Sequence, residues 1–147
     1  MNQSVTLMLF VLLSAGTTSW AQKQDKKQNP NSELEAAAAD VAKTWLESID
    51  KGKYAESWYQ AAKAIQDKVT QSDWTNQVST AREKLGNVVE RKVVVKKFMT
   101  EIQGAPKGEY VVVQFHTKFK NRAKAIETVT PMKESDGNWR VSGYHIK

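Results

Sequence analysis

The sequence predicts an α+β fold in which about three N-terminal helices pack on one face of a curved, four-stranded antiparallel meander sheet. Apolar residues recur at helical spacing up to Gly86 and alternate with polar residues after it. These are the patterns of amphipathic helices and of half-buried strands. Short turns rich in glycine and proline separate the later strands, so neighbouring strands should pair as hairpins. The length of 147 residues suits one domain of ordinary size.

The first 21 residues carry no charged side chain and contain an apolar run from Val5 to Ala15. This run has the length of a signal-peptide core and is too short to span a bilayer. Ser19 and Ala21 supply the small residues that precede a cleavage site. We therefore expect residues 1–21 to be a cleaved signal peptide, with an uncleaved anchor or a buried helix as the alternatives. The protein would then be periplasmic or secreted, without a transmembrane span in its mature form.

Residues 22–31 lack aliphatic and aromatic side chains, and such a segment cannot offset the entropy lost on ordering. We expect a flexible polar leader there, followed by a single α+β domain over residues 32–147. Ser32 and Glu35 have the spacing of a capping box at the start of the first helix. Gly52 is expected to end that helix. Its apolar stripe consists of Leu34, Ala38, Val41, Ala42, Trp45 and Ile49.

Two more helical patterns follow. The second runs from Tyr54 to Val69, and the third starts after Ser72, an expected N-cap, and ends at Gly86. Each of the three helices has one tryptophan within its apolar stripe, which favours a core role over a stacking platform for sugars or bases. These tryptophans are Trp45, Trp58 and Trp74.

Alternating patterns predict four strands, over residues 88–102, 110–119, 125–133 and 139–146. Pro131 cannot donate a ladder hydrogen bond, so it indicates an edge position or a bulge. Gly143 interrupts the last strand as a bulge would, and Asp136-Gly137 is a strong hairpin signal. In the first strand we expect one face to carry Val89, Val93, Val95 and Met99.

Three C-terminal segments resemble those of a known family. They are residues 104–112 (GAPKGEYVV), 127–132 (ETVTPM) and 136–144 (DGNWRVSGY). The helical part adds residues 45–46 (WL), 52–58 (GKYAESW) and 72–74 (SDW). Together they resemble the domain-of-unknown-function 4019 family over approximately residues 35–147. The resemblance implies a small exported bacterial protein with a cystatin-like or nuclear-transport-factor-two-like fold, and it implies no reaction, cofactor or catalytic residue.

Several chemistries find no support in the sequence. The absence of cysteine excludes disulfides, thiolate metal sites, iron–sulfur clusters and thiol nucleophiles. The seven glycines form neither a dinucleotide-binding fingerprint nor a phosphate-binding loop. His116 and His145 lie on different predicted strands, so two ordinary strand histidines are favoured over a metal site that a carboxylate completes. We expect no metal and no cofactor.

Acid–base catalysis is the enzymatic alternative that the sequence leaves open. A cupped fold of this class often holds a pocket between helices and sheet, in which one carboxylate can act as a base. Glu127 is the acidic residue most embedded in strand sequence, and His116 and Tyr144 are the neighbours best able to shuttle a proton. We favour a solvent-facing Glu127. The inward-facing residues of its strand would then be Ile126, Thr128, Thr130 and Met132.

The charge is concentrated in one segment. The net charge is +6, and residues 88–124 contain nine basic and three acidic residues, whereas the rest of the chain is balanced. If the first two strands are neighbours, this segment forms a basic sheet surface. Lys107 lies in the turn between them. The other basic residues of the segment are Arg91, Lys92, Lys96, Lys97, Lys118, Lys120, Arg122 and Lys124.

Three interpretations of this surface are open. A solvated lysine-rich edge that resists aggregation is the first, and contact with anionic lipid headgroups or cell-wall polymers is the second. Nucleic acid is a distant third, because arginine is scarce, no aromatics interleave with the cluster, and export removes the usual partners.

The leading hypothesis is a non-enzymatic exported domain. It would bind a small ligand, a protein or an envelope component through its cupped fold or its basic face. A pocket enzyme that uses one carboxylate, as an isomerase or hydrolase does, is the rival, and a purely structural or assembly role is the third.

Overall fold

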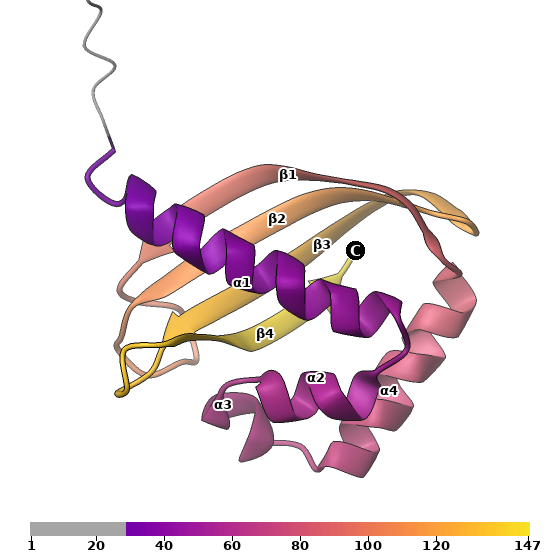
Figure 1. Cartoon of the computed structure of the whole chain (residues 1–147), viewed down its shortest axis with the longest axis horizontal. Coiled ribbons are helices and arrows are strands. Elements are labelled where there is room, and N and C mark those ends of the chain that lie inside the picture. The colour runs from indigo at the N-terminus through magenta and orange to yellow at the C-terminus, as the bar shows by residue number, and fades with distance from the viewer. Residues whose placement is uncertain (1–28) are drawn as a thin grey trace, which may run out of the picture.

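The computed structural model describes residues 29–147. The expected signal peptide and residues 22–28 of the expected leader lie outside this range. The helices are α1 (Ser32–Asp50), α2 (Tyr54–Gln60), α3 (Lys63–Gln66) and α4 (Gln71–Leu85). The strands are β1 (Val88–Met99), β2 (Tyr110–Phe119), β3 (Arg122–Lys133) and β4 (Trp139–Ile146). They form one antiparallel sheet in the order β1-β2-β3-β4, which confirms the α+β class and the meander topology (Figure 1).

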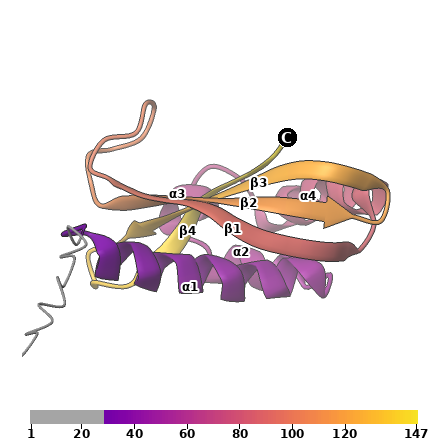
Figure 2. The ribbon, with the colours of Figure 1, turned by 90° about the horizontal axis from the view of Figure 1, so that it is seen from above.

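Among the described residues, helix α1 covers one face of the sheet and no helix packs on the opposite face. Helix α1 runs along the sheet and contacts all four strands, and the loop between β1 and β2 rises on the side away from α1 (Figure 2). Helix α2 packs against α1, α3 and α4, and α3 reaches β4. We call the side that α1 packs on the covered face and the opposite side the uncovered face.

The core lies between α1 and the covered face. Trp45 and Trp74 are buried there, and both indole nitrogens donate to Ser57, to its carbonyl at 2.8 Å and to its hydroxyl at 3.0 Å respectively. Trp58 is half-buried against the same cluster and donates to the carbonyl of Val69 at 2.9 Å. All three tryptophans are therefore core residues, as predicted, and each polar indole N–H has a partner.

The start of α1 differs from the predicted capping box. Ser32 is already helical, the N-cap is Asn31, and no side chain caps it. Glu35 instead accepts from the side chain of Asn29 at 2.9 Å and from the backbone N–H of Phe98 at 3.0 Å. The carboxylate thus serves a tertiary contact with β1, which a local capping rule does not anticipate.

The second predicted helix is two helices, because the chain is extended at Ala61 and Ala62. The backbone N–H of Ala62 donates to the carbonyl of Val141 on β4 at 2.8 Å. The sheet edge therefore takes a hydrogen bond that a continuous helix would keep. The N-cap of α4 is Thr70, which accepts from the backbone N–H of Asp73 at 3.1 Å, and the prediction of Ser72 is wrong.

The predicted faces of two strands are also wrong. Val89 is the extra residue of one register shift in β1 and is 59% exposed. A second shift, at Val94, turns Val95 to the uncovered face, where it is 37% exposed. In β3, Glu127 is buried with Ala125, Val129 and Pro131, whereas Ile126 is 39% exposed. The opposite assignment, in which Ile126, Thr128, Thr130 and Met132 face inward, is therefore incorrect.

The bulge signals of the last two strands are confirmed. Thr130 pairs with Gly143 and Pro131 with Val141, so Ser142 is the extra residue. Pro131 sits at this bulge and is buried, although β3 is an inner strand.

Candidate functional site

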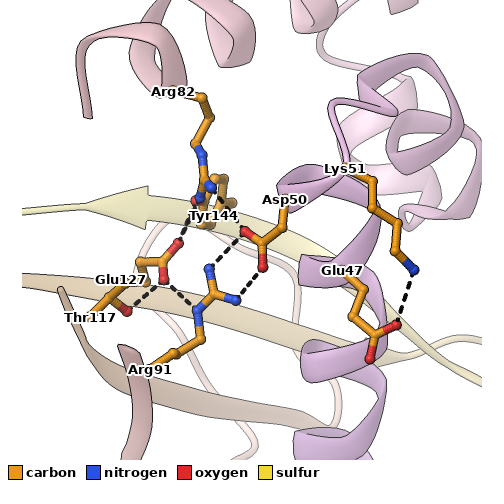
Figure 3. A network of polar contacts seen from close by, with 8 residues as sticks. All are labelled: Glu47, Asp50, Lys51, Arg82, Arg91, Thr117, Glu127 and Tyr144. Atoms are coloured by element: carbon orange, nitrogen blue, oxygen red, sulfur yellow. Dashed lines mark hydrogen bonds and ion pairs between the residues drawn. The ribbon is translucent and has the colours of Figure 1, made fainter. Parts of the chain in front are cut away.

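The carboxyl group of Glu127 lies at the centre of the covered face. Its side chain is fully buried, and its Oε2 accepts from Arg91 Nε at 2.7 Å and from Thr117 Oγ1 at 2.6 Å. Its Oε1 accepts from the Tyr144 hydroxyl at 2.7 Å. Figure 3 shows these donors converging on the carboxylate from three directions. Both oxygens are thus occupied by protein donors.

Two arginines tie this carboxylate to the end of α1. Arg91 also donates to both oxygens of Asp50, at 2.6 and 3.0 Å. Arg82 of α4 donates to Asp50 at 2.9 Å, and its Nη1 lies 3.5 Å from Glu127 Oε1. Figure 3 shows the polar contacts of both arginines. The guanidinium of Arg82 also sits 4.9 Å from the ring centre of Phe119. The buried ion network, as we call it, consists of Asp50, Arg82, Arg91, Thr117, Glu127 and Tyr144.

Strand register and the end of α1 position the side chains of the buried ion network. Arg91 pairs directly with Thr117 across β1 and β2, so both side chains reach the same carboxylate on β3. Asp50 is the last residue of α1, where a negative charge is unfavourable to the helix dipole. Two guanidinium groups offset this cost and fasten the end of α1 to the sheet and to α4.

The network raises the pKa of Arg91 and of Tyr144. Burial by itself would lower the pKa of Arg91, but hydrogen bonds to Asp50 and Glu127 outweigh it and raise its pKa above the ordinary arginine value. Burial, followed by the charge of Glu127, raises the pKa of Tyr144 well above that of an exposed tyrosine. Tyr144 is therefore a neutral hydrogen-bond donor at physiological pH.

The three residues named for acid–base chemistry do not converge. Glu127 and Tyr144 meet in the network, and the expectation of a solvent-facing Glu127 is wrong. His116 pairs with Lys92 and Ile126 and lies on the uncovered face. The sheet therefore separates His116 from the carboxylate. Arg91, a predicted member of the basic face, likewise points to the covered side and is only 15% exposed.

Basic side chains gather at a shallow groove of about 690 Å³ on the uncovered face. Ile126 and Ala123 supply apolar surface in it. We call it the open groove. Its charged residues and histidine are Glu90, Lys92, His116, Lys118, Arg122, Lys124 and Lys147.

Other predicted members of the basic face lie outside this groove. Lys97 pairs with Val112 on the uncovered face, Lys96 pairs with Val113 at the rim of the covered face, and Lys120 lies in the β2–β3 turn; all three are exposed. Lys107 is exposed in the β1–β2 loop and pairs with Glu101 at 2.9 Å.

Sequence reasoning missed Glu90 and Lys147 as groove residues. Glu90 pairs with Lys118 across the strands and forms an ion pair with Lys92 at 2.8 Å. Lys147 reaches the groove because its backbone continues the pairing of β4 with Ile126. The sequence did contain a signal for Glu90. It lies two residues before Lys92, and residues two apart in a strand point to the same face.

The metal alternative finds no geometry to support it. His116 is on β2 and His145 on β4, and β3 lies between these strands. Within residues 29–147 no three side chains of the ligand types His, Asp and Glu come together as a candidate metal site. None of the helices in that range is both long enough and apolar enough to cross a membrane.

The model of the family described as Protein of unknown function (DUF4019) matches residues 41–144. The chain belongs to this family. The matched region of the DUF4019 domain includes every member of the buried ion network and most of the open groove, with Lys147 outside it. Neither a curated protein nor a solved structure matches the chain.

Proposed function

We propose that this DUF4019 domain is an exported, non-enzymatic binding module that holds an anionic envelope component against the open groove. The observation that carries the proposal is the collection of Lys92, Lys118 and Lys124 around an apolar floor on the uncovered face. The family resemblance adds the expectation of export and of a cystatin-like cup, and an exported protein meets anionic lipids and cell-wall polymers.

The electrostatics of the groove support this choice. Glu90 is its one acidic side chain, and the hydrogen bond and charge of Glu90 raise the pKa of Lys92, which keeps that lysine cationic. Each lysine close to an anionic surface contributes roughly fivefold in affinity. The partly exposed Ile126 adds apolar contact beside the charges.

The geometry counts against the rival pocket enzyme. A general base must come within hydrogen-bond reach of a substrate proton, whereas Glu127 is fully buried and accepts from three protein donors. Large side chains fill the space between α1 and the covered face, among them Leu46, Phe115 and Ile49. A binding role on the uncovered face needs neither an empty interior nor a free base.

The test compares two triple variants that have the same net charge. One changes Lys92, Lys118 and Lys124 to Glu in the open groove. The matched control changes Lys43 of α1, Lys51 at the C-cap of α1 and Lys63 of α3 to Glu, and each of these side chains is more than half exposed. Co-sedimentation is measured with phosphatidylglycerol vesicles, with phosphatidylcholine vesicles as the neutral reference and purified cell-wall polymer as the second anionic probe.

We expect wild-type protein and the control to bind at least one anionic probe at low salt. The groove variant should bind at least about a hundredfold more weakly, because it removes three lysines and adds three negative charges. The probe that is bound identifies the source of the anion. Equal loss in both variants would mean that net charge alone drives adsorption. That result, or wild-type protein that binds neither probe, would contradict the proposal.

A further inference from the structure

The outer edge of β4 carries backbone groups that have no partner within residues 29–147. Ile126 and Lys147 exchange two backbone hydrogen bonds, at 2.8 and 2.9 Å. In an antiparallel ladder, the residues next to such a pair turn their N–H and C=O groups away from the partner strand. Ile146, and by the same alternation Tyr144, therefore present their backbone N–H and C=O groups at the outer edge of the sheet.

One half of this edge is covered and the other half is open. Val141 belongs to the same outward-turned set, and its carbonyl accepts from Ala62 in the segment between α2 and α3. Within residues 29–147, no backbone group makes the corresponding bond to Tyr144 or Ile146. The covered half shows that this edge can take an added extended segment.

A groove of about 440 Å³ runs beside the open half, between β4 and α4. Helix α4 lies on the β4 side of the sheet (Figure 1). The apolar residues that α4 contributes to the groove are Trp74, Val78, Ala81 and Leu85, and β4 supplies residues 144–146. An exposed strand edge facing a helix is an arrangement that captures extended peptides by β-augmentation.

The positive charge of this groove favours an acidic peptide. The ionisable side chains that line it are Arg82, Lys84, Arg122, Tyr144 and His145, and no aspartate or glutamate is among them. Lys84 and Arg122 make no ion pair within the described part of the chain. Carboxylates on alternate side chains of a bound strand would complement these cations.

We propose that the α4–β4 groove binds an extended acidic segment of a partner protein, which pairs with Tyr144 and Ile146 as a fifth strand. This site is separate from the open groove and does not depend on the function proposed above. The chain's own residues 22–28 suit it poorly, because they contain three lysines and one aspartate. A second copy of β4 would bring Arg140 and His145 and no acidic residue, which also opposes the cations of the groove.

The probe is a seven-residue peptide in which glutamate and valine alternate, titrated into the isotope-labelled protein. We expect chemical-shift changes at residues 144–146 and along α4, and about tenfold slower amide hydrogen exchange at Tyr144 and Ile146. The same peptide with lysine in place of glutamate should not bind. A version N-methylated at alternate amides should lose binding, because it keeps the charges and removes the ladder donors.

Two exposed positions of α4 provide the matched variants. Ala81→Glu places a carboxylate in the groove and should weaken peptide binding about tenfold. Thr80→Glu adds the same charge outside the groove on the same helix and should leave binding unchanged. Both positions are solvent-exposed in a helix that tolerates glutamate, so both variants should fold.

Four results would overturn the proposal. They are no binding at millimolar peptide, binding that survives N-methylation, shifts confined to Lys92 and Lys118 of the open groove, or protection of Tyr144 and Ile146 in a peptide-free dimer. The last result would assign the edge to a second copy of the chain.

Discussion

Two consecutive residues of β1, Arg91 and Lys92, lie on opposite faces of the sheet and differ in exposure and in partners. Arg91 points to the covered face, is 15% exposed, and holds Asp50 and Glu127. Lys92 points to the uncovered face, its side chain is 74% exposed, and its ion-pair partner is the neighbouring Glu90. The same positive charge therefore stabilises packing on one side and is available to a partner on the other.

The comparison explains why net charge alone does not locate a binding surface. A buried charge is costly to desolvate unless hydrogen bonds and an opposite charge compensate it. Arg91 meets this condition through hydrogen bonds to Asp50 and Glu127. Arg82 donates one hydrogen bond to Asp50, and its buried Nη1, which has no hydrogen-bond partner within residues 29–147, lies 3.5 Å from Glu127. That geometry fixes how α1 and α4 sit on the sheet, so we assign the network a structural role and the exposed lysines the binding role.

The largest expected effect comes from breaking the network. Arg91→Met should lower the free energy of unfolding by about 3–5 kcal/mol, because it leaves the two carboxylates short of a buried cation. Lys92→Met, the same replacement one residue later, should leave the urea midpoint unchanged within error. Equal urea midpoints for the two variants would contradict the claim that Arg91 on the covered face stabilises the fold and Lys92 on the uncovered face does not.

A smaller effect is expected at Tyr144. Tyr144→Phe removes the hydrogen bond to Glu127 and should cost about 1–3 kcal/mol, since the buried acceptor loses a donor. The pKa of Tyr144 is raised in the folded state, so its contribution is complete below the unfolded tyrosine pKa of about 10 and is lost as pH rises beyond it. Urea unfolding at pH 8 and pH 11 should show a steeper loss for wild type than for Tyr144→Phe, and parallel losses would contradict the raised pKa.

A third and still smaller loss of stability is expected when the contact between α1 and the edge strand β1 is removed. Glu35→Ala removes the acceptor for the backbone N–H of Phe98 on the edge strand β1. We expect a cost of about 1 kcal/mol, together with faster hydrogen exchange at the Phe98 amide. Unchanged exchange at Phe98 would show that α1 does not fasten this edge.

Salt should have the smallest effect on stability and a large effect on binding. Raising the salt concentration from 0.1 to 0.5 M screens exposed charges and leaves buried pairs largely unaffected. Binding to anionic vesicles should fall steeply, while the unfolding midpoint shifts little. A parallel fall in vesicle binding and in the unfolding midpoint would contradict this account. It would mean that salt screens the buried ion network as strongly as the exposed lysines of the open groove.

The sequence predicted the fold class because its strongest signals are local. Asp136-Gly137 specified a hairpin, and Pro131 and Gly143 marked the two sides of one bulge. The break between α2 and α3 was invisible, because Ala61 and Ala62 are good helix formers and only a contact with Val141 on β4 extends the chain there.

The candidate site was harder to predict for a physical reason. In β3, both alternating sets contain strand-forming residues, so the pattern could not tell which side Glu127 faces. The deciding groups, Arg82 and Asp50, come from two helices far away in the sequence. The lysines of the open groove could be predicted because charge density is a property of the sequence. The bulge of β1 between Val93 and Val95, which puts Lys96 on the same face of the sheet as Arg91, could not.

The most direct test of the account is to map the contact of the labelled protein with phosphatidylglycerol bicelles by amide chemical shifts. We predict the largest shifts at Lys92, His116, Lys118 and Ile126, which line the open groove, and none at Asp50 or Glu127 on the covered face. Shifts centred on α1 or α2, with the open groove unaffected, would contradict the division of roles between the two faces.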